Sequence, residues 1–346
     1  MIRTSNKTEF GIQHSSERYL WISFNVLVVI SSLVGDSIIL SASLNHTAIK
    51  LHKLIIAIIQ HLAVSDLVQN VLKVVPQIIA LVADAWILPP SFCHGQYHVT
   101  VFFAGLTAFL TGAMTCSKLL IVKFPLRSAA WSSRRGHLLC AILWVIGFCL
   151  HTPQLVASFI YGRDAVYFEY EWYVCNYDFT ATAAGSWPDW YLIISFGVGA
   201  VTVFVAITYS SVLLLWLARR TAVQLRVAMR WQGVVTVILT VVVFFISCSP
   251  WLLIYRSNIQ SPPIWRAAQF IQNLNIMANF FIYVGTVKSF REFLKLKAWQ
   301  IISSAMLRTA ASSHQRNRIL LRQISRQSHA DVGSRSSASH HRVSTV

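Results

Sequence analysis

The sequence predicts an all-α membrane protein: a seven-transmembrane helix bundle followed by a short amphipathic interfacial helix. Three observations support this fold class. Hydrophobic residues make up 55% of the 346-residue chain and charged residues only 12%, whereas soluble globular proteins carry about 25% charged residues. Seven windows are apolar enough to cross a bilayer, which takes about 20 residues. The basic residues gather on one side of these windows, and the composition argues against a soluble enzyme.

The predicted spans are read directly from the apolar windows, and together they form a bundle domain over residues 19–286. The windows cover 19–44, 52–82, 94–122, 136–160, 189–218, 232–257 and 264–286. Residues 1–18 are polar and lack the apolar core of a cleavable signal peptide. We therefore expect them to form an extracellular N-terminal segment.

The last two predicted regions follow the seventh span. Residues 287–299 place apolar and basic side chains on opposite faces, a pattern that is typical of a helix in the membrane interface. The apolar face carries Phe290, Phe293 and Leu294, and the basic face carries Arg291, Lys295 and Lys297. Residues 300–346 are rich in Ser, Arg and His, so we expect a disordered basic tail.

The distribution of charge predicts how the chain crosses the membrane. With the N-terminus outside, 22 of the 29 basic residues lie on the inner side, and 8 of the 12 acidic residues lie outside. This is the positive-inside pattern of a multi-pass protein. It predicts a plasma-membrane protein with an extracellular N-terminus and a cytoplasmic C-terminus. It also removes nucleic acid as the explanation of the formal net charge of +17.

Two cysteines and one asparagine are predicted to face the extracellular side. Cys93 opens the third span and Cys175 lies in the outer loop after the fourth, so both face an oxidising compartment. We expect a disulfide between them, the alternative being two free thiols. Asn6 begins an Asn-Lys-Thr glycosylation sequon. The sequence has no Cys/His cluster with the spacing of a zinc site.

Several markers, in order and at the expected spacing, resemble those of the rhodopsin-like G-protein-coupled receptors over about residues 19–299. They are Leu62-Ala-Val-Ser-Asp66, Cys93 with Cys175, Trp144, Lys123-Phe-Pro125-Leu126, Pro250, Asn279-Phe-Phe-Ile-Tyr283 and Ser289-Phe-Arg-Glu-Phe293. The resemblance implies a non-enzymatic receptor that needs no cofactor, binds an extracellular small molecule or peptide in the outer half of the bundle, and activates a heterotrimeric G protein. Two alternatives stay open: an atypical receptor with weak or no G-protein signalling, and a small transporter or channel, although a transporter's internal repeat is not found.

The chain departs from the family pattern at the residues that switch the receptor. The family's Asp/Glu-Arg-Tyr motif reads Ser117-Lys118-Leu119, its first-span Asn is Asp36, its sixth-span Trp is Cys248, and the seventh-span Pro is Phe280. At three other switch positions, the chain has the residue that the family pattern has: Tyr209, Pro250 and Tyr283.

The altered motif has consequences for signalling. Lys118 keeps a positive charge without the planar fork of an arginine, and Ser117 has no charge to restrain it. The resemblance then implies either raised basal activity or weaker coupling. Serines of the tail offer phosphorylation sites for an arrestin-type partner; a basic tail attracted to anionic membrane lipid is the other interpretation.

Two carboxylates are predicted at membrane depth, where charge is costly and normally marks function. The resemblance places Asp66 in a sodium site, with Asp36 nearby and Thr107, Asn275 and Asn279 as further oxygen donors. The alternative is a protonated Asp66 hydrogen-bonded to its amide neighbours. Two adjacent carboxylates ionise together only around a cation, so we expect a sodium ion or one shared proton.

The outer half of the bundle holds the candidate ligand site. Lys73 lies two helical turns outward from Asp66. It either lines the site, favouring an anionic or strongly accepting ligand, or snorkels to the outer interface. Further candidates in helical pairs are Gln96 with Thr100, Trp251 with Tyr255, and Gln269 with Asn273. The family's amine-binding Asp is Thr100 here and the retinal lysine is Asn273, which argues against an amine or a retinal ligand.

Overall fold

The computed structural model describes most of the predicted membrane domain. It covers residues 15–44, 51–129, 131–161, 166–169, 174–177, 228–257 and 262–300, with isolated residues at 205–216 and 302–306. Two compact units divide the chain, Met1–Arg291 and Glu292–Val346. The predicted fifth span, 189–218, lies almost wholly outside the described residues, as do Asn6 and nearly all of the predicted tail.

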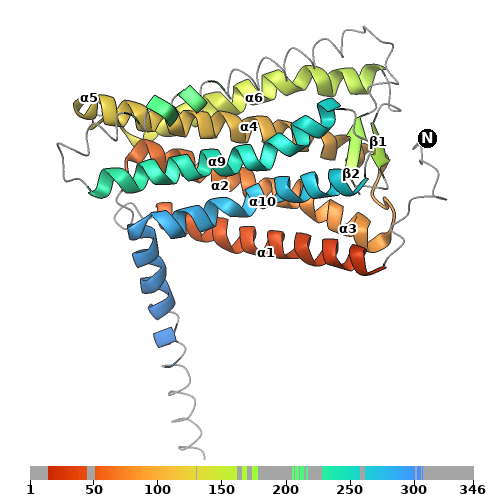
Figure 1. Ribbon diagram of the computed structural model, residues 1–346, viewed down its shortest axis with the longest axis horizontal. Coiled ribbons are helices and arrows are strands. Elements are labelled where there is room, and N and C mark those ends of the chain that lie inside the picture. Colours follow the sequence, from red (N-terminus) through yellow and green to blue (C-terminus); the bar gives the residue numbers. More distant parts are fainter. Residues whose placement is uncertain are drawn as a thin grey trace, which may run out of the picture. The chain divides into compact units, whose positions relative to one another are not determined.

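The first unit consists of long helices that run side by side (Figure 1). They are α1 (Ser15–Leu44), α2 (Lys53–Gln69), the π-helix η1 (Asn70–Val74), α3 (Val75–Ala83), α4 (Pro90–Lys123), α5 (Pro125–Ala129), α6 (Ser133–Tyr161), α9 (Ala228–Ser257) and α10 (Pro262–Thr286). Neighbouring helices pack as α1 with α2 and α10, α2 with α4 and α6, and α9 with α4 and α10.

Four helical segments of the described chain are long and apolar enough to cross a membrane. They are Glu17–Leu44, Lys53–Ala83, Pro90–Ile121 and Ser133–Pro153, and Val235–Pro250 is a shorter apolar stretch. These segments coincide with the first four predicted spans, and the shorter stretch lies in the sixth. A helical multi-pass membrane protein is therefore confirmed. The complete seven-span bundle stays a prediction.

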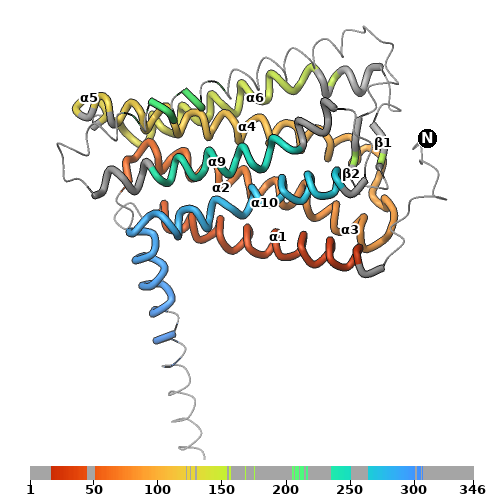
Figure 2. The backbone as a smooth tube through the Cα atoms, in the orientation of Figure 1, coloured from red at the N-terminus to blue at the C-terminus, as the bar shows by residue number. Residues whose placement is uncertain are grey.

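The second predicted span is interrupted by a wider turn. Pro76 has no N–H to donate, so a regular helix cannot continue through its position without losing a hydrogen bond. The chain forms the π-helix η1 just before it, in which the Val75 N–H bonds the Asn70 carbonyl. Figure 2 shows α2 and α3 following one another along one path. Such π-turns within α-helices are frequent at functional sites.

The ends of the helices are fixed by polar contacts. His52 caps α2: its Nδ1 accepts a hydrogen bond from the Leu54 N–H, and its Nε2 lies 2.9 Å from the Ser128 carbonyl. At the other end, Asp84 ends α3 in a left-handed conformation and pairs with Arg18 at 3.4 Å. Arg266 of α10 pairs with Glu17 of α1 at 3.1 Å.

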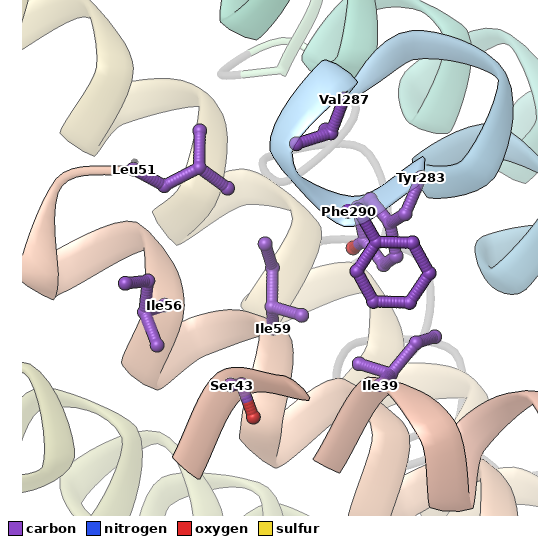
Figure 3. Close-up of a pocket in the computed structure, with 8 residues that line it drawn as sticks. All are labelled: Ile39, Ser43, Leu51, Ile56, Ile59, Tyr283, Val287 and Phe290. Atoms are coloured by element: carbon purple, nitrogen blue, oxygen red, sulfur yellow. The ribbon is translucent and has the colours of Figure 1, made fainter. Parts of the chain in front are cut away.

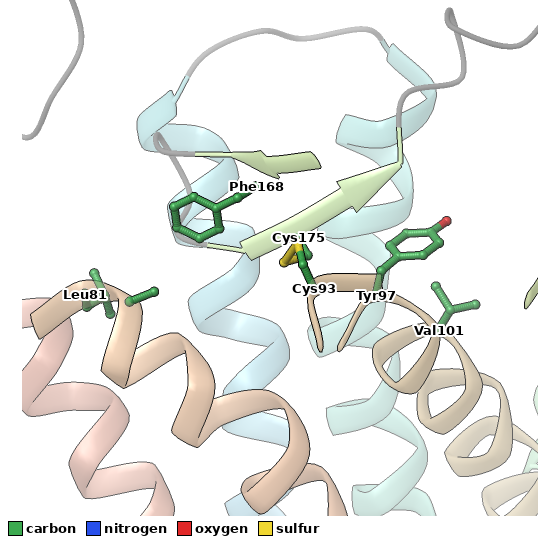
Figure 4. Packing of buried hydrophobic residues seen from close by; sticks show 7 residues of the cluster. Leu81, Cys93, Tyr97, Val101, Phe168 and Cys175 are labelled. Carbon is green, nitrogen blue, oxygen red and sulfur yellow. A yellow bond between two sulfur atoms is a disulfide. The ribbon is translucent and has the colours of Figure 1, made fainter. Parts of the chain in front are cut away.

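A two-stranded hairpin joins the first unit at one end, which the all-α prediction did not include. Strand β1 (Val166–Glu169) pairs antiparallel with β2 (Val174–Tyr177). The hairpin is held down by the disulfide between Cys93 and Cys175 and by the fully buried Phe168 (Figure 4). A hydrophobic cluster with α3 and α4 surrounds it, formed by Ala80, Leu81, Cys93, Tyr97, Val101, Phe168 and Cys175. The predicted disulfide is thus confirmed.

The chain continues as a helix after α10. Residue 287 interrupts the helical pattern, and residues 288–300 are helical again. Arg291 Nη1 donates to the Gly285 carbonyl at 2.6 Å, across the break. The placement of this helix in the membrane interface stays a prediction.

Candidate functional site

Lys73 points into the interior of the bundle. Its side chain is only 2% exposed, and its ammonium donates to Gln272 Oε1 of α10 at 3.1 Å. Cys248 of α9 lies close to this ammonium. This position favours the interior interpretation of Lys73 over the snorkelling one, because the ammonium lies among helices and not at the outer interface.

Gln96 connects Lys73 to the hairpin. Its side-chain Nε2 donates to the Lys73 carbonyl at 3.0 Å, and its Oε1 accepts from the Cys175 N–H at 3.4 Å. This carbonyl lies in the π-helix η1. Gln96 therefore joins three segments that are far apart in sequence: η1, α4 and β2.

A second set of amides lies between α1, α3 and α10. Asn273 Nδ2 donates to Asn25 Oδ1 at 3.0 Å and to Gln77 Oε1 at 3.2 Å. Asn25 in turn donates to the Trp21 carbonyl at 3.0 Å. All three amide side chains are buried, and Asn273 Oδ1 has no partner among the described residues. We call Lys73, Gln96, Gln272, Asn25, Gln77 and Asn273 together the lysine cluster.

The other predicted ligand residues fall into two groups. Thr100 is half-buried, and its hydroxyl donates to the Gln96 carbonyl of its own helix at 2.9 Å; Gln269 is buried in α10. Trp251 and Tyr255 lie in α9, but their side chains lie outside the described part of the structure.

The two predicted carboxylates form a separate carboxylate cluster. Asp36 and Asp66 are both fully buried and interact electrostatically with each other. Asp66 Oδ2 accepts from Asn279 Nδ2 at 2.7 Å, and Asp36 accepts from the Ser32 hydroxyl. The other oxygen of each carboxylate has no hydrogen-bond donor among the described residues.

The remaining predicted donors are distributed unevenly around these carboxylates. Tyr283 is buried beside them, and its hydroxyl has no partner among the described residues. The Thr107 hydroxyl is buried and also lacks a partner there, and Asn275 is half-buried. Within the described chain, neither Thr107 nor Asn275 hydrogen-bonds Asp66. The carboxylate oxygens without a donor, Asp36 Oδ1 and Asp66 Oδ1, suit a small cation or a shared proton. Among the described residues, no group of three or more His, Cys, Asp or Glu side chains could hold a metal ion.

Lys118 lies at a small cavity between α2, α4 and α9. The cavity is otherwise lined mainly by apolar side chains, and Thr236 of α9 contributes a hydroxyl. Ser117 and Lys118 are both buried. Thr236 Oγ1 lies 2.7 Å from Thr286 Oγ1 of α10. Because Thr286 donates to the Ile282 carbonyl at 2.6 Å, Thr236 is the donor in the contact between the two helices.

A neighbouring apolar pocket lies between α1, α2 and α10 (Figure 3). It is lined by Ile39, Ser43, Leu51, Ile56, Ile59, Tyr283, Val287 and Phe290.

The other predicted switch residues lie as follows. Cys248 and Pro250 are half-buried in α9, whereas the Tyr209 side chain is 67% exposed.

The sequence prediction missed three members of the lysine cluster, namely Asn25, Gln77 and Gln272. Each is a polar residue in a largely apolar helix, which is the same signal that identified Lys73. Gln272 directly precedes the predicted Asn273, but helical pairing at i and i+4 selected Gln269 instead.

Two curated relatives match part of the chain. Chemerin-like receptor 1 of Sus scrofa is 24% identical over 132 residues, which covers 37% of this chain and 34% of the relative. Cephalotocin receptor 1 of Octopus vulgaris is 26% identical over 129 residues, covering 37% of this chain and 32% of the relative. The matched part thus spans about a third of each relative's length.

A family model covers far more of the chain. The model described as 7 transmembrane receptor (rhodopsin family) matches residues 35–290. This range includes the carboxylate cluster, the disulfide, the Lys118 cavity and every member of the lysine cluster except Asn25. The members of this family are receptors and not enzymes. The chain therefore belongs to the rhodopsin family of seven-transmembrane receptors.

Proposed function

We propose that the protein is a plasma-membrane receptor that binds an extracellular ligand within a seven-span bundle and activates a heterotrimeric G protein. The match to the receptor family over residues 35–290 carries this proposal. The excess of basic residues on one side supports an extracellular N-terminus and a cytoplasmic C-terminus.

The ligand is proposed to bind at the lysine cluster. This cluster lies next to the hairpin that the disulfide fixes, and in the proposed topology the hairpin is extracellular. Buried polar groups that converge within an apolar site are typical of ligand pockets. The proposed ligand residues are Lys73, Gln96, Thr100, Trp251, Tyr255, Gln269 and Asn273.

The carboxylate cluster is proposed to hold a sodium ion between the two sites of the receptor. Asp36 and Asp66 repel each other at close range, and a cation between them removes this repulsion. Asn279 fixes one oxygen of Asp66 and leaves the other free. Such a cation would stabilise one arrangement of α1, α2 and α10.

The G protein is proposed to engage the end of the bundle around Lys118. The cavity there lies between α9 and the helices that carry Lys118 and Ile55, so outward movement of α9 would open it. Lys118 would then contact the partner through a single ammonium. The serines and arginines of the tail would serve an arrestin-type partner after phosphorylation, and the anionic lipid surface before it.

A G-protein dissociation panel in cells tests the proposal. The parent receptor should dissociate at least one G-protein class, with or without added ligand. Lys118→Arg and Ser117→Asp should change basal or stimulated output, with cell-surface expression measured in parallel. Removal of residues 300–346 should abolish arrestin recruitment while leaving dissociation. Silence of the well-expressed parent and of Lys118→Arg across the panel would refute the signalling function.

One alternative function is favoured by a specific observation. The substitutions at Lys118 and Cys248 alter two switch positions of the family while the ligand-binding half keeps its buried polar groups. A receptor that binds ligand without signalling would combine these features. In the same panel, ligand binding without G-protein dissociation would support this alternative, and restored dissociation in Lys118→Arg would identify the lysine as its cause.

A further inference from the structure

Lys73 carries a buried positive charge without a negative partner among the described residues. Its hydrogen-bond acceptor, Gln272 Oε1, is neutral. Arg18 pairs with Asp84 and Arg266 pairs with Glu17, and all four of these side chains are partly exposed. Burying an ammonium among neutral groups is costly, and a buried charge is normally compensated by an opposite one. A compensating anion from outside the described chain would remove this cost.

The backbone of Lys73 is held in place. Lys73 lies within the π-helix η1. The Gln96 side chain donates to the Lys73 carbonyl and accepts from the hairpin backbone at Cys175. The disulfide fixes that hairpin to α4. A charge on a rigid backbone binds a ligand with less loss of conformational freedom than a charge on a mobile loop.

The groups around Lys73 offer donors and neutral acceptors. Gln272 can turn its amide NH₂ toward an incoming anion once the ammonium has a new acceptor. The two carboxylates of the bundle interior are engaged elsewhere, Asp36 with Ser32 and Asp66 with Asn279. Lys73 is the basic member of the lysine cluster, and the other five members are neutral amides. One positive charge beside an amide matches a singly charged carboxylate better than a doubly charged phosphate.

We infer that Lys73 is the counter-charge for a carboxylate of the extracellular ligand, which Gln272 assists with its amide. This inference rests on the proposed ligand site. The carboxylate replaces Gln272 Oε1 as the acceptor of the Lys73 ammonium. Binding therefore breaks a contact between η1 and α10. Helix α10 thereby senses the charge of the ligand.

The probes are pairs of alkyl- and aryl-carboxylic acids with their primary amides, tested on the purified full-length receptor in detergent. The readout is the thermal unfolding midpoint at increasing ligand concentration. Variants are Lys73→Met, which keeps the apolar stem, and Lys73→Arg, which keeps the charge. Arg266→Gln serves as the matched control, because it removes a positive charge from α10 at an ion pair outside the cluster.

At least one acid should stabilise the parent more than its amide does. Lys73→Met should weaken that acid by about 10- to 100-fold, the usual range for losing one hydrogen bond to a charged group. Lys73→Arg and Arg266→Gln should retain binding. The ligand-free Lys73→Met receptor should unfold at the same or a higher temperature, because an unpaired buried charge is gone.

Two outcomes overturn the inference: no acid exceeds its amide, or the advantage of the acid survives Lys73→Met. Should the methionine variant fail to fold, Lys73→Gln replaces it with the same criteria. G-protein dissociation is measured separately on the same probes. An acid that binds through Lys73 without causing dissociation refutes the signalling function alone, whereas dissociation by neutral ligands that is indifferent to Lys73→Met refutes the carboxylate site alone.

Discussion

Replacing Gly35 by alanine should force α1 and α10 apart beside the carboxylate cluster. Gly35 precedes Asp36, and Phe280 follows Asn279, so their contact lies next to the residues that hold Asp66. A Cβ on residue 35 would lie 2.6 Å from Phe280 Cγ and 2.7 Å from Phe280 Cβ. Phe280 stands where the family resemblance leads us to expect proline, and Gly35 leaves room for its larger side chain.

The size of the effect follows from these distances. Carbon atoms in contact prefer a separation of about 3.5–4.0 Å, so the two helices must separate locally by about 1 Å. Rotation of the Phe280 ring cannot relieve the clash, because Phe280 Cβ is attached to the backbone. Overpacking of this kind costs about 1–3 kcal/mol. Alanine returns up to about 1 kcal/mol through its helix preference.

The assay is the thermal unfolding midpoint of the purified receptor, with Gly285→Ala and Gly95→Ala as controls. A Cβ at either control position meets nothing within 4 Å. Because the helix preference of alanine enters all three variants, Gly35→Ala should be less stable than the controls by about 1–3 kcal/mol. In the Phe280→Ala background, adding Gly35→Ala should no longer lower stability, as expected for residues in contact. Equal midpoints for Gly35→Ala and the controls would refute the reasoning.

Two further predictions concern the contact of Thr236 in α9 with Thr286 in α10 and the carboxylate cluster. Thr286→Val removes the hydroxyl that accepts from Thr236 and should raise basal signalling about fivefold, the equivalent of about 1 kcal/mol for one hydrogen bond. Thr240→Val is the control, since the Thr240 hydroxyl donates to the Thr236 carbonyl of its own helix. Equal basal output in both variants argues against the contact as a restraint. Sodium should change the agonist affinity of the parent receptor by about fivefold or more, as typical coupling energies imply. Asp66→Asn should abolish this dependence on sodium. Agonist binding that is insensitive to sodium in both proteins excludes the ion.

The membrane class and the disulfide could be predicted from sequence because each depends on a local pattern. A run of apolar residues needs no information about its neighbours to predict a span, and α1, α4 and α6 include or closely follow the windows that predicted them. Cys93 and Cys175 were assigned to the same compartment by topology alone. The hairpin between β1 and β2 was missed because its strands are only four residues long and are held by a disulfide and by packing of Phe168.

The site was predicted residue by residue but not as a network. Sequence periodicity placed Lys73 on the face of Asp66, assuming a regular helix of 3.6 residues per turn. The π-turn at Asn70–Val74 changes that register by lengthening one turn, and no pairing rule on one helix could select Gln272, 199 residues away from Lys73. Contacts between distant helices depend on the packing of the whole bundle, which periodicity does not contain.

The two clusters divide the charge of the bundle interior in a way that separates their roles. The carboxylates Asp36 and Asp66 lie together, so their interaction is repulsive and a cation or proton stabilises them without any ligand from outside. Lys73 follows Asp66 in the same span, within the π-helix η1, and its carbonyl accepts a hydrogen bond from Gln96. Had Lys73 been placed to pair with Asp66, each site would have neutralised the other. Their separation allows the proposed cation and the proposed ligand carboxylate to bind at different places, and α10 contacts both clusters through Asn279 and Gln272.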